Sequence, residues 1–165
     1  MRNIMTIALA ATALVSAVAN AATATTTFAV TATVLKTCSA SANALAFGSY
    51  TPGSGAVAGT TTVSIKCTNG TPYSVALNGG STTSGTIAQR LMANGTNILQ
   101  YNLYTTSSFG TIWGDGTTGS TQAGTGSGVA TANTLTVYGQ LPDSATNQSA
   151  VTGSYTDTVT VTVTY

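Results

Sequence analysis

Few side chains in this sequence could do chemistry, and those present lack their usual partners. The 165 residues include no His and no Glu, and the carboxylates are Asp115, Asp143 and Asp157. Without His there is no Ser-His or Cys-His pair to activate a nucleophile. A Ser-Lys arrangement using Lys36 or Lys66 stays open in principle. We therefore predict that the protein is not an enzyme, and no motif indicates a cofactor.

The first 21 residues have the pattern of a secretory signal. Arg2 precedes an apolar run from Ile4 to Val18, and Ala19-Asn20-Ala21 has the form that signal peptidase cleaves. A transmembrane anchor is the competing interpretation, but the run is short for a bilayer span and the cleavage pattern follows at once. We expect residues 1–21 to be removed, leaving a mature chain from Ala22 that is not inserted in a membrane.

The two cysteines, Cys38 and Cys67, are the remaining reactive groups. A metal site would need ligands that the chain does not offer, because it has no His, no CxxC pair and only scattered Asp. Two cysteines after a secretion signal are typical of one disulfide formed in an oxidising compartment. By the chain-entropy model, closing that loop stabilises the fold by roughly 3–4 kcal/mol.

The mature chain is expected to carry no net charge. Lys36, Lys66 and Arg90 balance the three aspartates, so three minus three gives zero. A neutral surface has no field to attract nucleic acid, and it lacks the self-repulsion that keeps proteins apart. We therefore expect no nucleic-acid partner and a surface that tolerates association.

The elements that would position these residues are strands. Nothing in the mature chain repeats apolar residues at helical spacing, and alternation between Gly, Pro and Asn turns favours an all-β fold. Turn spacing and the early cysteine suggest an immunoglobulin-like sandwich, which needs about seven strands. Six strands are predicted in the domain itself: 44–50 (ALAFGSY), 62–67 (TVSIKC), Tyr73–Leu77, Leu99–Leu103, Leu135–Leu141 and Tyr155–Tyr165.

Two other features have structural interpretations. The stretch GDGTTGSTQAGTGSG, residues 114–128, has low complexity and is predicted to be a flexible surface connection; a receptor-contact loop is the alternative. The lone Trp113 is expected to be a core or loop anchor rather than a sugar platform, because one aromatic residue is a weak binding signal.

The two ends of the mature chain are both uncharged segments with the alternation of a strand. From Thr158 to Tyr165 the last strand has no charge, no Pro and no Gly, although such residues normally guard an exposed sheet edge. This strand is either interior to its sheet or left open for a partner. Residues 25–35 are equally uncharged, and they alternate as a strand with four apolar side chains on one side: Phe28, Val30, Ala32 and Val34.

Five pieces of the chain, taken in order, resemble the spore coat protein U domain family. That family includes the pilin subunits of archaic chaperone–usher pili of Gram-negative bacteria. The resemblance covers nearly the whole mature chain, and its pieces are LAFGSYTPGSG (45–55), VSIKCTNGTPYSVALNGG (63–80), LQYNLYTTSSFGTIWGDGT (99–117), VYGQLPD (137–143) and GSYTDTVTVTVTY (153–165).

The resemblance implies an incomplete sandwich that lacks its last strand. Residues 22–35 would be a donor-strand extension and 36–165 the pilin domain, with Cys38–Cys67 linking its first two strands. A periplasmic chaperone would lend a strand first, and an outer-membrane usher would exchange it for the extension of an identical or related subunit. The groove would be bordered by the first strand, near Cys38, and by the last, with its edge at Val159, Val161, Val163 and Tyr165.

These features together favour donor-strand complementation. The function implied is that of a structural subunit of surface pili, exported through the periplasm, that serves adhesion and biofilm formation. Two alternatives remain open at this point: a secreted, self-contained sandwich that binds carbohydrate as a monomer, and a spore or cyst coat component.

Overall fold

The structure is a computed structural model that describes residues 20–165. The predicted signal therefore lies outside the described residues except for Asn20 and Ala21. The chain divides into two units, one up to Thr33 and the other from Val34 to Tyr165. Residues 20–37 form no helix or strand and their side chains are exposed.

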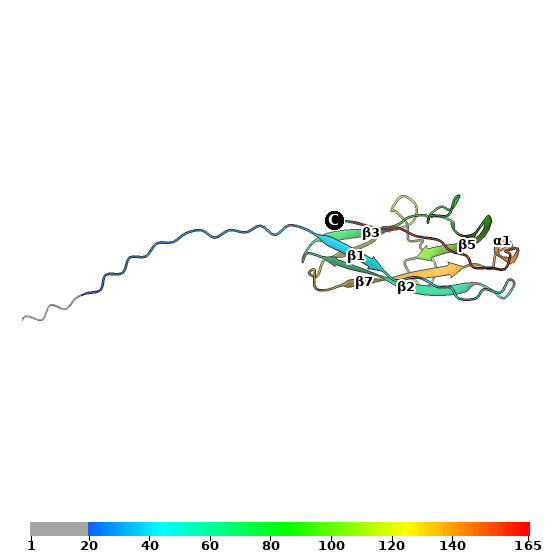
Figure 1. Ribbon diagram of the computed structural model, residues 1–165, viewed down its shortest axis with the longest axis horizontal. Coiled ribbons are helices and arrows are strands. Elements are labelled where there is room, and N and C mark those ends of the chain that lie inside the picture. Colours follow the sequence, from blue (N-terminus) through cyan, green and yellow to red (C-terminus); the bar gives the residue numbers. More distant parts are fainter. Residues whose placement is uncertain (1–19) are drawn as a thin grey trace, which may run out of the picture. The chain divides into compact units, whose positions relative to one another are not determined.

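The regular elements of the unit from Val34 to Tyr165 are β-strands, apart from one short helix (Figure 1). One sheet has five strands in the order β1-β2-β7-β5-β4, and the other has three in the order β6-β3-β8. Every pairing is antiparallel. The elements are β1 (Cys38–Ala42), β2 (Val57–Cys67), β3 (Pro72–Leu77), β4 (Arg90–Asn94), β5 (Asn97–Tyr104), β6 (Gln122–Thr125), β7 (Asn133–Leu141), α1 (Ala145–Gln148) and β8 (Val161–Thr164).

The two sheets share one core, which confirms the predicted sandwich. Side chains alternate along β2 and β3, so that one side of each strand is buried and the other is more exposed. Removing this apolar surface from water is the main stabilising term, at roughly 25 cal/mol per Å². The buried core cluster consists of Val63, Ile65, Cys67, Tyr73, Val75, Leu77, Tyr101, Leu103, Trp113 and Val137.

The predicted disulfide joins the first two strands. Cys38 and Cys67 are register partners in the β1–β2 ladder, and their sulfur atoms are bonded. The link closes a loop with a sequence separation of 29 residues. It therefore fixes β1, which has only β2 as a sheet neighbour, to the edge of the larger sheet.

A buried cation and the single tryptophan connect the sheets. Arg90 is fully buried, and its guanidinium donates to the Asn78 carbonyl at 2.9 Å, to Asn102 Oδ1 at 2.6 Å and to the Trp113 carbonyl at 2.8 Å. Burial lowers the pKa of Arg90. Trp113 is also fully buried, and its Nε1–H donates to the Val75 carbonyl at 2.9 Å. Trp113 is thus a core anchor, as the sequence predicted.

The strand count and one loop differ from the sequence prediction. The domain has eight strands rather than six, because β1, β4 and β6 were not predicted and 44–50 is not a strand. The prediction that 114–128 is only a flexible connection is also wrong. Its residues Gln122–Thr125 form β6, which the long-range ladder with β3 stabilises in spite of the Gly-rich sequence.

Two predicted strands are irregular for the same physical reason. Residues 44–50 form no strand, and the last strand begins at Val161 rather than Tyr155. Both segments still alternate between half-buried and exposed side chains. Each lacks a complete backbone ladder on either side, so the extended chain is present without the hydrogen bonds that define a strand. Within residues 20–165, no helix has the length and hydropathy needed to span a membrane.

Candidate binding groove

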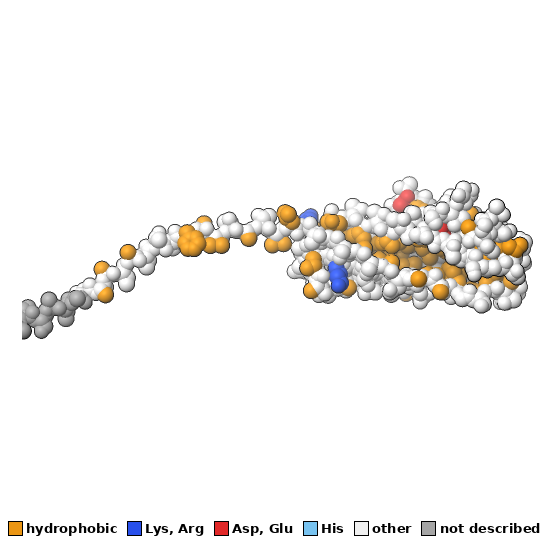
Figure 2. Space-filling model, in the orientation of Figure 1, with side chains coloured by type: hydrophobic (Ala, Val, Ile, Leu, Met, Phe, Trp, Pro, Cys, Tyr) orange, Lys and Arg blue, Asp and Glu red, His pale blue; other side chains and the backbone are white. Residues whose placement is uncertain are grey.

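An apolar groove runs along the domain between residues 44–50 and residues 150–161. It contains two neighbouring cavities, one of about 680 Å³ and one of about 300 Å³. Figure 2 shows a band of apolar side chains along this face of the domain. The larger cavity reaches to Tyr50 and Val151, and the smaller one to Ala42 and Val161. Both are lined by Leu45, Phe47 and Met92.

The first wall of the groove is the segment 44–50. It leaves the β1–β2 ladder after Asn43, whose N–H donates to the Thr62 carbonyl at 3.1 Å and whose Nδ2 donates to Thr62 Oγ1 at 2.9 Å. Among the described residues, nothing forms a hydrogen bond with the backbone of residues 44–49. Their N–H and C=O groups are therefore available to another extended chain.

Asp143 holds the far end of this wall. Its carboxylate accepts hydrogen bonds from the Tyr50 hydroxyl at 2.5 Å and from the N–H groups of Gly53 at 3.0 Å and Gly55 at 2.9 Å. These bonds, with that from Tyr50 the strongest influence, lower the pKa of Asp143. Partial loss of solvation and the bond to Asp143 raise the pKa of Tyr50 to about 12. The wall is thus fixed at both ends and unpaired between them.

The second wall is the segment that leads into β8. On the side of β3 it is held by the Asn78 N–H, which donates to the Thr160 carbonyl at 3.2 Å, and by the Thr160 N–H, which donates to Asn78 Oδ1 at 2.8 Å. β8 has no neighbour in its sheet other than β3, so its other edge is open. At the entry to the segment, Thr156 exchanges two backbone hydrogen bonds with Ala93 of β4.

Asp157 anchors this second wall from within the groove. Its Oδ2 accepts from the Tyr101 hydroxyl at 2.6 Å, and its Oδ1 accepts from the N–H groups of Ser81 at 2.8 Å and Thr82 at 3.0 Å. Partial burial raises the pKa of Asp157, but the bonds from Tyr101, Ser81 and Thr82 outweigh it, so the pKa lies below its usual value. The carboxylate joins the wall to the core and to the loop after β3.

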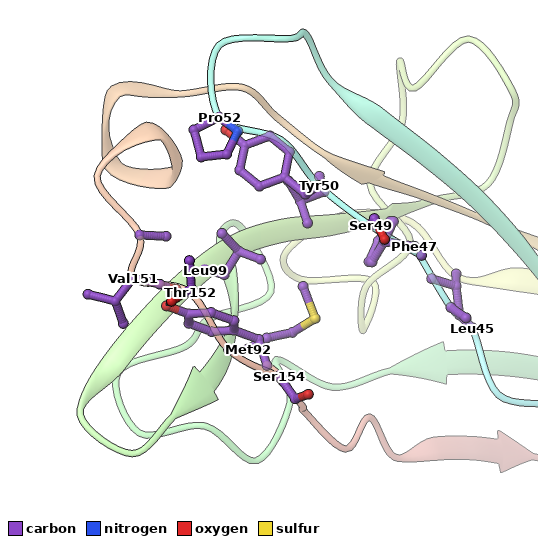
Figure 3. A pocket seen from close by; sticks show the side chains of 16 residues that line it. Leu45, Phe47, Ser49, Tyr50, Pro52, Met92, Leu99, Val151, Thr152 and Ser154 are labelled. Atoms are coloured by element: carbon purple, nitrogen blue, oxygen red, sulfur yellow. Dashed lines mark hydrogen bonds between the residues drawn. The ribbon is translucent and has the colours of Figure 1, made fainter.

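The floor and lining of the groove fit an apolar occupant. Buried residues of both sheets, among them Val63, Leu77 and Val137, line the smaller cavity. Met92, Leu99 and Leu141 line the larger one, which Figure 3 shows opening between the two walls. Asp157 is the charged side chain among the residues of the two linings, and its oxygens already accept hydrogen bonds. In the described part of the chain, no group of three or more His, Cys, Asp or Glu could hold a metal ion.

The residues predicted for the groove edge divide into two pairs. Val159 and Val161 line the smaller cavity. Val163 packs on the core but lines neither cavity, and Tyr165 is 54% exposed. β1, which contains Cys38, lies near β8 but forms no ladder with it. Ala42 is the residue of β1 that lines a cavity, so residues 44–50 contribute more of the lining than β1 does.

The side chains predicted for the donor strand are exposed to solvent. Phe28, Val30 and Val34 are 86%, 83% and 82% exposed, and Ala32 is exposed as well. Large apolar side chains so open to water are unusual for a soluble protein unless they meet a partner.

Sequence reasoning missed several residues of the groove. Met92 lies in none of the pieces that carry the resemblance, and Asp143 and Asp157 lie in two of them without an assigned role. Only the folded chain brings Met92 and Asp157 to the groove and Asp143 to the end of its first wall. The one available signal was the alternation in 44–50, which puts Leu45 and Phe47 on one face of an extended chain but does not show the missing strand partner.

Comparisons with known proteins agree with the fold. A similar solved structure is described as the CsuC-CsuE chaperone-tip adhesion subunit pre-assembly complex from archaic chaperone-usher Csu pili of Acinetobacter baumannii. The likeness has a TM-score of 0.56 and 28% sequence identity, and it covers 81% of this chain. The matched region is 41% of that solved chain, so this protein is similar to less than half of its length. No curated protein matches this chain.

The family model adds a match to nearly the whole sequence. The model described as Spore Coat Protein U domain matches residues 24–162, which include the exposed alternating segment and both walls of the groove. By this match the chain belongs to the Spore Coat Protein U domain family.

Proposed function

We propose that this protein is a structural subunit of a chaperone–usher pilus, and that its groove accepts residues 25–35 of another copy as a donor strand. The observation that carries the proposal is the pair of facing, extended walls with unpaired backbone edges above an apolar floor. A sheet with such edges recruits an added strand through main-chain hydrogen bonds, while its pockets take alternate side chains.

The exposed N-terminal segment has the features of the missing strand. It is uncharged, and its alternating side chains Phe28, Val30, Ala32 and Val34 would all face one side of an extended chain. Eleven residues in β conformation span about 36 Å, which is a long strand for a domain of this size. Its exposed Val and Phe would each gain about 1.5–3 kcal/mol on full burial, and each backbone hydrogen bond would add about 0.5–1.5 kcal/mol.

Completion of the fold would drive assembly. Before assembly the groove would need another strand, which in this proposal a periplasmic chaperone supplies. An outer-membrane usher would then exchange that strand for the extension of an identical or related subunit. Family membership and the likeness to a chaperone-bound pilus subunit support these partners. Export to the cell surface, adhesion and biofilm formation follow from the same proposal.

Two variants of the donor segment test the proposal. Val30→Asp would place an unpaired carboxylate in an apolar pocket, at a cost of several kcal/mol. Thr31→Asp adds the same charge one residue away, on the side that would face water. We expect Val30→Asp to abolish fibres, seen by electron microscopy of the producing cells, while soluble chaperone complexes persist. Thr31→Asp should leave fibres in place.

A different outcome would support another class of protein. If Val30→Asp formed fibres as Thr31→Asp does, residues 25–35 would not enter an apolar groove. If the mature chain were a stable monomer without a chaperone, the protein would be a self-contained secreted sandwich, and the donor-strand proposal would be wrong.

A further inference from the structure

The groove is divided by a ridge. Leu45 and Phe47 of the first wall line both cavities, as does Met92 of β4, so these side chains lie where the two spaces meet. Figure 3 shows the three side chains at the larger cavity. Phe47 is fixed further by an edge-to-face contact with the buried Tyr101, with 5.9 Å between the ring centroids. We use the name ridge for Leu45 and Phe47.

A pair of glycines supports the ridge from below. Gly59 of β2 and Gly139 of β7 are register partners in the larger sheet. A Cβ at Gly139 would lie 2.8 Å from Leu45 Cδ1 and 3.0 Å from Phe47 Cζ, and a Cβ at Gly59 would lie 3.1 Å from the Ala46 carbonyl oxygen. Only the absence of side chains at these two positions lets the ridge sink this far between the sheets.

We propose that this ridge limits the size of one donor side chain, and that Ala32 of a second copy is the side chain that packs against it. The inference rests on the proposed function. Consecutive side chains on one face of a strand are about 6.6 Å apart, and in the register that we propose one of the four donor side chains lies over the ridge while its neighbours enter the cavities. Ala32 is the small member of the set and has a larger side chain on each side.

The glycine pair and Ala32 then act as one size filter. The glycines set the height of the ridge, and the height sets the room left for the donor. A larger residue at position 32 would overlap Leu45 or Phe47, and a side chain at Gly139 would raise the ridge against Ala32. A larger residue at Val30 would instead point into a cavity.

Peptide binding to the full mature chain tests this filter without a chaperone or usher. Synthetic peptides of residues 25–35 are compared with their Ala32→Leu and Val30→Leu versions by fluorescence polarisation. Ala32→Leu should weaken binding about fivefold or more, as overpacking by about 1–3 kcal/mol implies. Val30→Leu should change it about twofold or less, because a cavity receives the added methylene. The ratio of two affinities on one protein does not depend on how much of that protein is folded.

A second protein variant makes the test reciprocal. On the Phe47→Ala chain the penalty of the Ala32→Leu peptide should largely disappear, because the ridge is lower. On the Gly139→Ala chain an Ala32→Gly peptide should bind better than the natural one. Equal binding of the Ala32→Leu and Val30→Leu peptides to the natural chain, or an unchanged penalty on Phe47→Ala, would overturn the ridge while leaving the groove in place. If the natural peptide bound no better than its Val30→Asp version, the proposed function itself would fail.

Discussion

Replacing Asp157 with Asn tests how the second wall of the groove is held. The side chain is nearly isosteric, so the packing of the segment before β8 is kept while the negative charge is lost. In the natural protein the carboxylate accepts from Tyr101 and from the N–H groups of Ser81 and Thr82. An amide replaces one acceptor oxygen with an NH₂ group, which then faces a donor.

The expected loss of stability is about 2 kcal/mol. Hydrogen bonds to a charged group contribute about 1.5–3 kcal/mol each, and neutral ones about half of that. Asn keeps the bonds to one oxygen in weaker form and leaves the buried Tyr101 hydroxyl without its charged acceptor. Since the site is partly open to water, we take the lower part of the range.

Urea unfolding of the mature protein, with its groove filled by the synthetic peptide of residues 25–35, measures this loss. With a slope of 1–3 kcal/mol per M, a loss of 2 kcal/mol lowers the midpoint by about 1 M. Asp115→Asn is the matched control, because Asp115 accepts only from Thr117 and Thr118 of its own exposed turn, and Asn makes the same turn. Equal midpoints for the two variants would refute the anchoring role of Asp157.

Three further predictions concern the stability of the same peptide-filled protein. Cys38→Ser opens the disulfide to Cys67 and should lower the free energy of unfolding by about 3 kcal/mol, which calorimetry under non-reducing conditions would show; an unchanged melting temperature would contradict it. Arg90→Lys leaves buried carbonyl acceptors without donors and should lower the free energy of unfolding, measured in urea, by about 3 kcal/mol or more. A variant as stable as the natural protein would show that these bonds contribute little. The folded pKa values of Asp143 and Asp157 are depressed, so their contribution is complete above the unfolded pKa near 4 and is lost as the pH falls through the folded values; a denaturation midpoint that stayed constant from pH 6 to pH 2 would refute this.

The sequence predicted the strands whose pattern is local. β3, β5 and β7 alternate apolar and polar residues between clear turn signals, and each was expected within about two residues of its bounds. For β2 only the alternating second half, 62–67, was expected. β1 was missed because CSASA has small side chains and no apolar face. β6 was missed because QAGT lies in a Gly-rich stretch, and its strand conformation comes from pairing with β3, far away in the sequence.

The groove was only partly predictable for a related reason. The resemblance placed Val159 and Val161 at the edge of an acceptor groove; both line the smaller cavity, and their role in accepting a strand stays a prediction. Arg90 was counted as a balanced surface charge. It is in fact fully buried, and its guanidinium donates to carbonyl groups of segments that are distant in the sequence. The ridge also depends on long-range contact, since Gly59 and Gly139 meet beneath Leu45 only when β2 pairs with β7.

The most direct test of the central claim is to find what residue 30 touches in assembled protein. A photo-crosslinking amino acid replaces Val30, fibres are made from a mixture of isotopically labelled and unlabelled copies, and the crosslinked peptides are identified by mass spectrometry. The donor-strand account predicts links between copies, from position 30 to peptides containing Leu45–Phe47 or Val159–Val161. Links confined to a single copy, or links between copies at surfaces outside both walls of the groove, would contradict it.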